Sequence, residues 1–358
     1  MAVHFHKLKI KAIKKETPDC VSIAFTVPEA LQETFAFEQG QNITLKQILD
    51  GEELRRSYSI CSAAFENELK VAVKKVEGGK FSCWANDILK AGDEIEVLPP
   101  TGKFNTKLQA TNKKNYLAFA AGSGITPVLS IIKTTLQTEP QSSFTLIFGN
   151  RSRASIIFFE ELEGLKNKYL QRFNFINILS RERTDAPINY GRIDPQKLTE
   201  LNKLVDYNSV DDFFICGPEA MIFCVRDFLS ANGIDQKKIH FELFTTPGQQ
   251  QKIGNRKQET ADTGPKSKIT VKLDGRSFDF DLGFNNDTIL DAALKQGADL
   301  PFACKGGVCC TCRAKLLEGQ VKMDVNWGLE QEEIEQGFIL TCQSHPTTEK
   351  VVVDFDIR

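Results

Sequence analysis

Four cysteines near the end of this chain constrain its folding more than any other feature of the sequence. Three of them are spaced C-x₄-C-x₂-C and one follows at a distance, in the order Cys304, Cys309, Cys312 and Cys342. Two iron ions bridged by sulfide need four thiolates at fixed tetrahedral positions, and this spacing is typical of a plant-type 2Fe–2S site. The fold must therefore bring one tight loop and one distant cysteine together around a one-electron cofactor.

The residues around these cysteines support a cluster site. Gly306 and Gly307 lie in the first gap, where glycine allows positive φ and lets backbone N–H groups approach the sulfurs. The apolar run 338–340 predicts a buried strand that delivers Cys342. A zinc knuckle would show two close cysteine pairs, and a disulfide framework is typical of short secreted chains. Both alternatives are therefore disfavoured.

Six further cysteines need another explanation. Cys310 could be mistaken for a ligand, but only Cys309 gives both required gaps, so we expect Cys310 to be a packed thiol. The chain shows no signal peptide, and in a reducing compartment free cysteines behave as small hydrophobic residues. We expect that role for the other five, which are Cys20, Cys61, Cys83, Cys216 and Cys224.

The composition is that of an ordinary globular protein. Of the 358 residues, 41% are hydrophobic and 26% are charged, and the net charge is −2. Nothing in this balance indicates binding to nucleic acid or to a membrane, and the longest apolar runs fall short of the roughly 20 residues that span a bilayer. We therefore expect a cytoplasmic protein.

The chain is long enough for two or three domains, because single cores stop growing near about 250–300 residues. Short alternating segments across 1–108 predict an antiparallel β-barrel or sandwich. Fully apolar segments that alternate with helical stretches across 109–245 predict a parallel α/β sheet. The polar stretch 246–265 predicts a linker, and 266–358 would hold the cluster with a net charge of −4 from 11 basic and 15 acidic residues.

A glycine turn in the predicted α/β domain is a candidate phosphate site. The apolar strand at 116–120 runs into Gly122-Ser123-Gly124-Ile125-Thr126-Pro127, and an amphipathic helix follows. A strand, a glycine turn and a helix N-terminus together form an anion site, and Pro127 suits a first helical turn. Because the proline stands where a dinucleotide fingerprint has its third glycine, a merely structural turn remains an equal alternative.

Basic and polar residues after the next strands favour a phosphorylated nucleotide. Arg151 follows the second strand, and Ser180 and Arg181 follow the third. An NAD site would ordinarily place an acidic residue there, whereas arginine accommodates a 2′-phosphate, so NADPH is preferred over NADH. The fourth strand ends at Cys216-Gly217-Pro218, which puts a thiol and a glycine turn at the edge where nucleotides bind.

A chain that holds a nicotinamide site and a cluster needs a converter, since a hydride carries two electrons and the cluster accepts one. Flavin is the usual converter. The β-domain offers Arg56-Ser57-Tyr58-Ser59, which supplies a cation, an aromatic ring and a hydroxyl that could reach the flavin N5. A second glycine turn, Gly78-Gly79-Lys80-Phe81-Ser82, precedes the amphipathic segment 83–89 and suits the flavin pyrophosphate.

The segments RSYS, GGKFS, GSGITP and CGP occur in the order seen in the ferredoxin-NADP⁺ reductase family, and a ferredoxin-like end completes the resemblance over nearly the whole chain. The resemblance implies an antiparallel β-barrel FAD domain, an α/β NADP-binding domain and a β-grasp 2Fe–2S domain. It also implies roles for single residues: Arg56, Tyr58 and Ser59 on FAD, Gly79 and Ser82 on its pyrophosphate, Thr126 and Cys216 on the nicotinamide. Ser59 and Cys216 are then the candidate catalytic residues.

The same resemblance implies FAD rather than FMN, NADPH as the donor, and a di-iron oxygenase component as the acceptor of single electrons. A reductase for a Rieske-type oxygenase is the main alternative, and a redox-sensing nucleotide-binding protein is an alternative of another class. The acidic run 330–335 is either a solvated helix face or a docking surface for a basic patch on the partner.

Overall fold

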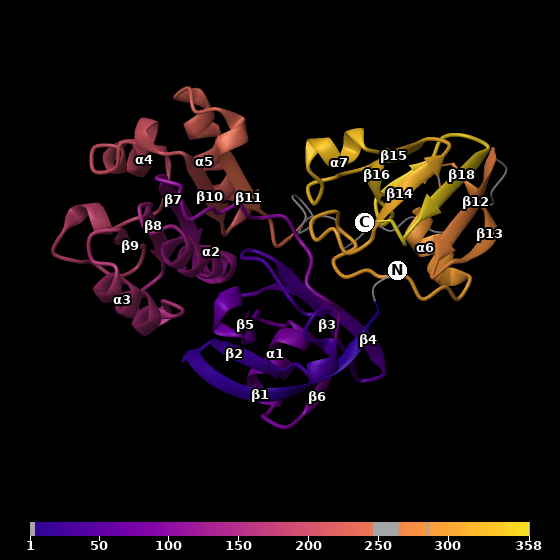
Figure 1. The fold of residues 1–358 in the computed structure, drawn as a ribbon, viewed down its shortest axis with the longest axis horizontal. Coiled ribbons are helices and arrows are strands. Elements are labelled where there is room, and N and C mark those ends of the chain that lie inside the picture. The colour runs from indigo at the N-terminus through magenta and orange to yellow at the C-terminus, as the bar shows by residue number, and fades with distance from the viewer. Residues whose placement is uncertain (1–3, 246–264, 285, 358) are drawn as a thin grey trace. The chain divides into compact units, whose positions relative to one another are not determined.

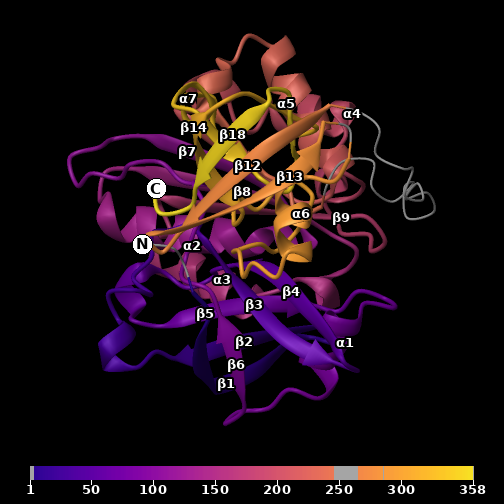
Figure 2. The ribbon, with the colours of Figure 1, turned by 90° about the vertical axis from the view of Figure 1, so that its right-hand side faces the viewer.

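A computed structural model describes residues 4–245, 265–284 and 286–357 of the protein (Figures 1 and 2). The chain divides into two compact units. One unit consists of Lys7–Leu54 and Tyr58–Leu243, and the other consists of Phe244–Arg358 with Met1–His6 and Arg55–Ser57. The predicted linker 246–265 lies outside the described residues except for Pro265.

Six strands within residues 6–97 form one sheet in the order β4-β3-β6-β1-β2-β5. The strand pairs β1–β2, β2–β5 and β3–β6 are antiparallel. Ile60, directly after edge strand β4, bridges Val71 in the other edge strand β5, so the sheet closes into a barrel. The strands and the helix beside them are β1 (His6–Thr17), β2 (Cys20–Thr26), β3 (Asn42–Leu49), β4 (Glu52–Ser59), β5 (Leu69–Lys74), β6 (Glu94–Val97) and α1 (Lys80–Asp87).

The alternation of apolar and polar residues along these strands explains why they form a barrel with a buried core. Inward side chains of β1, β2 and β5, including Leu8, Ile23 and Val71, are fully buried, and Phe81 of α1 packs into the same core. The helix begins at Lys80, three residues before the predicted amphipathic segment, because the turn at Gly78 and Gly79 leads straight into it. The antiparallel barrel predicted for the first part of the chain is confirmed.

Five parallel strands form the second sheet, in the order β11-β10-β7-β8-β9. The chain runs outward from β7 through β8 to β9 and then returns to β10 on the other side of β7, so the strand order switches between β7 and β10. The elements are β7 (Asn115–Ala121), α2 (Ile125–Thr138), β8 (Ser143–Asn150), α3 (Phe159–Lys168), β9 (Phe173–Leu179), α4 (Pro195–Leu201), β10 (Asp212–Cys216), α5 (Glu219–Ala231) and β11 (Ile239–Glu242).

The central strands of this sheet are apolar along their whole length. Leu117, Ala118, Phe119 and Ala120 are all fully buried, which requires cover on both faces of the sheet. Helix α2 provides part of that cover, with Ile125, Val128, Leu129 and Ile132 in the same core as the strands. The predicted parallel α/β architecture is confirmed, and its carboxyl edge between β7 and β10 is where nucleotides bind in such sheets.

The cluster segment lies in a third sheet of order β13-β12-β18-β14-β16. Strands β12 and β18 are parallel, the other neighbours are antiparallel, and α6 packs into the core of the sheet, which is a β-grasp arrangement. The elements are β12 (Lys266–Leu273), β13 (Arg276–Gly283), α6 (Ile289–Lys295), β14 (Arg313–Glu318), β15 (Val321–Met323), α7 (Gln331–Glu335), β16 (Phe338–Leu340), β17 (Ser344–Pro346) and β18 (Lys350–Asp354).

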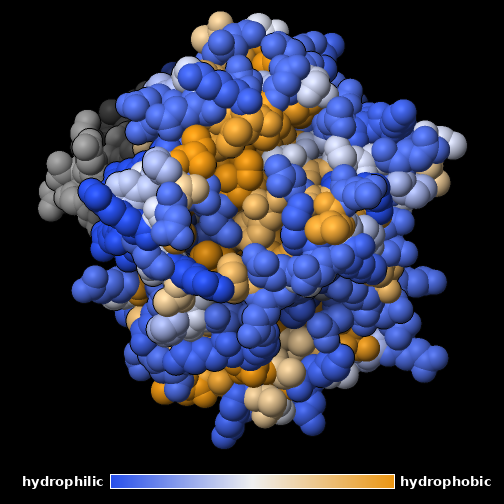
Figure 3. Space-filling view, turned by 90° about the vertical axis from the view of Figure 1, so that its left-hand side faces the viewer, coloured by the Kyte–Doolittle hydropathy of each residue, from blue (hydrophilic) through white to orange (hydrophobic). Residues whose placement is uncertain are grey.

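The surface is mainly hydrophilic, as the composition of an ordinary globular protein predicts. On the face shown in Figure 3, hydrophilic side chains predominate and hydrophobic ones gather mainly near its centre. In the part of the chain that the structure describes, none of the helices has the length and apolar character needed to cross a membrane.

Candidate functional site

The two predicted nucleotide loops meet at the switch point of the parallel sheet. The turn Gly122–Gly124 follows β7 and leads into α2, and Gly122 has φ of +55°, which glycine adopts without strain. A Cβ atom on Gly124 would lie 2.0 Å from the carbonyl oxygen of Cys216 at the end of β10. One on Gly217 would lie 3.1 Å from the backbone nitrogen of Ala121. Gly124 is therefore needed for these loops to pack against each other, whereas a side chain at residue 217 would require its neighbours to shift slightly.

The polar groups at the start of α2 are partly used by the turn itself. The Thr126 hydroxyl donates to the carbonyl oxygen of Ser123 at 3.0 Å, and both Thr126 and Pro127 are buried. Pro127 occupies the third position of the helix, where a missing N–H costs little. Pro218 stands immediately before α5 and ends the Cys216–Gly217 turn. These contacts hold both loops in defined conformations at the carboxyl edge of the sheet.

Cys216 is a neutral thiol. Its side chain is fully buried, and burial together with the carboxylate of Glu242 raises its pKa well above the usual value for cysteine. Strands β10 and β11 set Cys216 directly opposite Glu242. Such a thiol can pack against a ligand or donate a hydrogen bond, but it is not a thiolate nucleophile.

Ser59 joins the barrel to this edge of the parallel sheet. It is buried at the end of β4, and its Oγ donates to Glu242 Oε2 at 2.9 Å. Glu242 therefore lies beside both candidate catalytic residues, Ser59 and Cys216. The sequence interpretation missed it, because β11 was not among the predicted strands. The sequence did offer one signal for this residue: a carboxylate ends the short segment Ile239–Glu242, which follows a helix.

The candidate residues for a 2′-phosphate lie side by side after β8 and β9. The N–H of Arg181 donates to the carbonyl oxygen of Arg151 at 2.8 Å, and the N–H of Ser180 donates to that of Asn150 at 2.9 Å. Both guanidinium groups are exposed, and neither makes an ion pair within the described residues. A carboxylate is also present, since Glu182 accepts the N–H of Arg153 at 2.8 Å. The edge therefore offers two cations to a phosphate beside one anion.

The predicted flavin residues of β4 differ in exposure. Arg56 is exposed and donates to the carbonyl oxygen of Arg55 at 2.7 Å, whereas Ser57 and Tyr58 are half-buried. The Tyr58 ring lies 5.8 Å from the ring of Phe81. The first turn of α1 thus supports the Tyr58 ring through an aromatic contact.

The second glycine turn is shaped by a serine. Ser82 Oγ accepts the N–H of Val76 at 3.0 Å and donates to the carbonyl oxygen of Gly79 at 3.1 Å. Gly78 has φ of +72°, and Lys80 pairs with Glu52 at 2.5 Å. The turn leads into the N–H groups at the start of α1, an arrangement that binds anions in other proteins, and Ser82 holds the backbone of the turn in place. The assignment of single residues to FAD stays a prediction.

The cluster loop has the backbone that a group of sulfur ligands needs. It connects α6 to β14, and Lys305, Gly307 and Cys310 all have positive φ. A Cβ atom on Gly307 would lie 2.7 Å from the side chain of Val325, so glycine is required there. The N–H of Gly306 donates to Cys304 Sγ at 3.2 Å. Short N–H···S contacts of this kind stabilise the charge of a cluster.

The four predicted ligands form two pairs. Cys304 and Cys309 are hydrogen-bonded to each other, and so are Cys312 and Cys342, which follows the buried strand β16. The hydrogen bond from Cys304 lowers the pKa of Cys309, and that from Cys312 lowers the pKa of Cys342. Two iron ions bridged by sulfide need four thiolates, and the chain brings four cysteines together in two pairs. The residues present therefore fit a 2Fe–2S group.

Comparison with known proteins places three domains along the chain. Residues 7–106 match the oxidoreductase FAD-binding domain, 119–227 match the oxidoreductase NAD-binding domain, and 271–347 match the 2Fe–2S iron–sulfur cluster binding domain. These matches confirm the three cofactor types predicted from the sequence. The boundaries 1–108, 109–245, 246–265 and 266–358 stay predictions.

Whole-length relatives are also found. One subunit of 1,2-phenylacetyl-CoA epoxidase from Escherichia coli (strain K12) is 48% identical over 99% of this chain and 98% of its own. The ferredoxin reductase component of 3-ketosteroid-9-alpha-monooxygenase from Rhodococcus rhodochrous is 33% identical over 97% of this chain and 96% of its own. Among solved structures, phthalate dioxygenase reductase matches 98% of each chain with a TM-score of 0.57 and 24% identity, a likeness of fold.

Proposed function

Because this chain belongs to the family of oxygenase reductases with FAD-binding, NAD-binding and 2Fe–2S domains, we propose that it carries electrons from NADPH to a di-iron oxygenase. The observation that carries this proposal is the hydrogen bond between Ser59 and Glu242. It holds the strand with the flavin residues against the carboxyl edge of the nucleotide sheet. Hydride transfer requires the nicotinamide and the flavin to come together, and this contact brings their proposed binding residues together.

Bound FAD would supply the conversion of one hydride into two single electrons, and a bound cluster would carry those electrons singly. The protein's own residues then act mainly by binding and orientation. The neutral thiol of Cys216 and the Glu242 carboxylate lie on neighbouring strands at the nucleotide edge and carry no proton to the substrate. The Ser59 hydroxyl donates a hydrogen bond to Glu242, which fixes the orientation of the hydroxyl group.

Iron ligation is proposed for Cys304, Cys309, Cys312 and Cys342. Arg56, Ser57, Tyr58 and Ser59 are proposed to contact FAD, with the turn at Gly79, Lys80 and Ser82 on its pyrophosphate. We place the nucleotide phosphates on Gly122, Gly124, Thr126 and Pro127, its 2′-phosphate on Arg151, Ser180 and Arg181, and its nicotinamide beside Cys216, Gly217 and Pro218.

The electron acceptor is proposed to be the phenylacetyl-CoA epoxidase of aerobic phenylacetate degradation, because the relative at 48% identity is part of that enzyme. A second candidate is the oxygenase of another system, including Rieske-type oxygenases, since a relative at 33% identity serves a ketosteroid monooxygenase. The protein would work in the cytoplasm without nucleic acid or membrane. We also propose domain boundaries at 1–108, 109–245, 246–265 and 266–358.

An anaerobic titration with NADPH and with NADH, with cofactor analysis, tests the chemistry. We expect reduction of FAD and then of the cluster, with NADPH effective at lower concentration than NADH. NADPH-driven turnover of a one-electron dye would exclude a purely redox-sensing role, and its failure would contradict the reductase proposal. Substrate-dependent NADPH oxidation with phenylacetyl-CoA and the oxygenase part of the epoxidase then separates the two candidate acceptors.

A further inference from the structure

A buried lysine lies where the barrel meets the parallel sheet, and the chemistry described above does not use it. The side chain of Lys133, on α2, is only 5% exposed. Its Nζ lies 2.5 Å from Glu66 Oε1 and 2.6 Å from Glu161 Oε1. Burial of an ammonium group is costly unless it is paired, and here it has two carboxylate partners.

The two partners belong to different layers of the molecule. Glu161 lies on α3, a helix of the nucleotide-binding sheet, like α2 itself. Glu66 lies in the loop between β4 and β5 of the barrel, seven residues after Ser59 along the chain. One ammonium group therefore bridges a nucleotide-side helix and the flavin-side loop.

A second contact joins the same helix face to the same loop. Ser130 stands three residues before Lys133, so both project from one face of α2. The Ser130 hydroxyl donates to the carbonyl oxygen of Ser62 at 2.7 Å, and both serines are fully buried. Two independent attachments at adjacent points fix the direction of the helix as well as its position.

Helix α2 connects these two contacts to the predicted nucleotide site. It begins at Ile125, directly after the glycine turn, and Lys133 lies eight residues further on, about 12 Å along the axis. The loop at the other end of the attachment leads back through Ser62 to Ser59. We propose that Lys133 is a positioning residue for hydride transfer, which holds the nucleotide loop in place against the strand that carries Ser59. This inference rests on the proposed function.

The two carboxylates provide a matched pair of variants. Glu66 and Glu161 lie at nearly equal distances from Lys133, and each side chain is 30% exposed. E66Q weakens the bridge between the layers, whereas E161Q weakens a contact within the nucleotide-binding layer. Glu66 Oε2 also accepts the N–H of Ala63 at 2.8 Å, and glutamine keeps an oxygen for that bond.

The experiment measures flavin reduction by saturating NADPH in anaerobic stopped flow, with the apparent nucleotide Kd, for the holoenzyme, E66Q, E161Q, K133Q and the two double variants. We expect E66Q and K133Q to slow flavin reduction about 10-fold, because small misplacements of reacting groups have large effects on rate. The nucleotide Kd should change less than about twofold, and E161Q should keep a near-normal rate. K133Q combined with E66Q should be no slower than K133Q alone.

A structural readout accompanies the kinetics. In hydrogen exchange of the holoenzyme, E66Q should accelerate exchange in residues 60–66 several-fold, while E161Q leaves that loop unchanged. Equal slowing by E66Q and E161Q, or a normal rate in E66Q whatever its exchange, would overturn the positioning role. If the unchanged protein does not reduce its flavin with either nucleotide, the proposed function itself fails, and this inference falls with it.

Discussion

The backbone of Gly124 packs against the carbonyl oxygen of Cys216 so closely that a Cβ atom on residue 124 would lie 2.0 Å from that oxygen. The oxygen belongs to the backbone of β10 and cannot move aside as a flexible side chain could. We expect Gly124→Ala to push the two loops apart, to lower the free energy of unfolding by about 1–3 kcal/mol, and to weaken nucleotide binding. Urea unfolding and nucleotide titration measure the two effects.

Gly164→Ala is the control for that substitution. Gly164 lies inside α3, and a Cβ atom there would meet nothing within 4 Å. Alanine at this position should raise the free energy of unfolding by about 0.5–1 kcal/mol, because it reduces the conformational entropy of the unfolded chain. Equal stability changes in the two variants would contradict the proposed packing of the loops.

Ser59→Ala removes the donor that Glu242 Oε2 accepts at 2.9 Å. Because Ser59 is buried, we expect a loss of about 1–2 kcal/mol in the free energy of unfolding and flavin reduction slowed about 10-fold or more. Stopped-flow reduction at saturating nucleotide measures the rate. Ser209→Ala, at an exposed hydroxyl that donates to the carbonyl of Asp206, is the control. A normal rate in the Ser59 variant would rule out a role for this contact.

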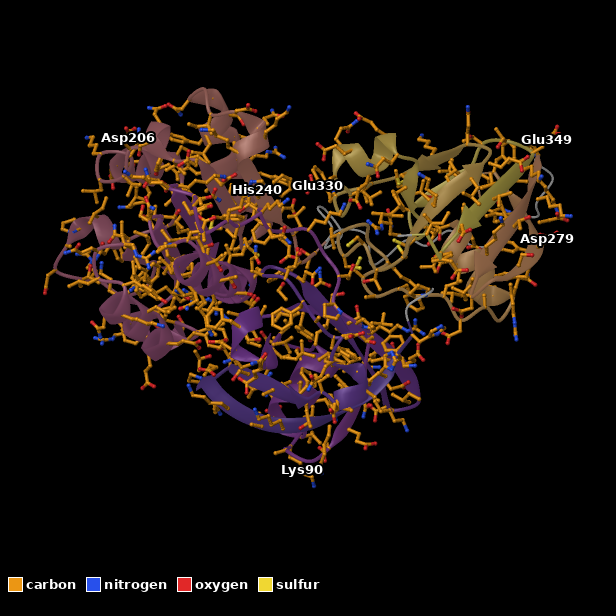
Figure 4. All side chains as sticks on the ribbon, in the orientation of Figure 1. Lys90, Asp206, His240, Asp279, Glu330 and Glu349 are labelled. Atoms are coloured by element: carbon orange, nitrogen blue, oxygen red, sulfur yellow. The ribbon has the colours of Figure 1, made fainter. Side chains whose placement is uncertain are left out.

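Much of the fold could be predicted because the signals are local. The cysteine spacing, the glycine turn after 116–120 and the wholly apolar central strands each depend on a few neighbouring residues. Strand β11 was missed because it is an edge strand of four residues, Ile239–Glu242, with alternating polarity instead of an apolar run. His240 of this strand, labelled in Figure 4, is one of its polar members.

The pairings between distant residues could not be predicted. Ser59 and Glu242 are 183 positions apart, and no periodic pattern joins them. Lys133 is nearly buried, although lysine is usually exposed, because two carboxylates from separate segments converge on it. A contact between distant residues also separates one member of the acidic run 330–335 from the others. Glu333 is buried and paired with Arg313, so this residue serves the fold of the cluster domain and not a docking surface.

Cys20 predicts a pH dependence of stability. Burial, with a smaller contribution from Asp19, raises the pKa of its thiol to about 12. Between about pH 9 and 12 the unfolded chain releases this proton and the folded protein keeps it, so stability falls as the pH rises. Cys20→Ala should make the decline in unfolding free energy shallower by up to about 1.4 kcal/mol per pH unit. Parallel curves for both proteins above pH 9 would contradict a buried neutral thiol.

Cys309 and Cys310 are adjacent, and replacing each by serine tests the ligand assignment. Cys309 is buried and hydrogen-bonded to Cys304, whereas Cys310 is half-buried in a positive-φ conformation. We expect Cys309→Ser to remove the visible absorption bands of the 2Fe–2S cluster, because serine does not supply the thiolate that iron requires. Cys310→Ser should keep those bands and the iron content. If Cys310→Ser removes the absorption bands and Cys309→Ser does not, the ligand is residue 310 instead of residue 309. The pairing of Cys304 with Cys309 would then have no role in binding iron.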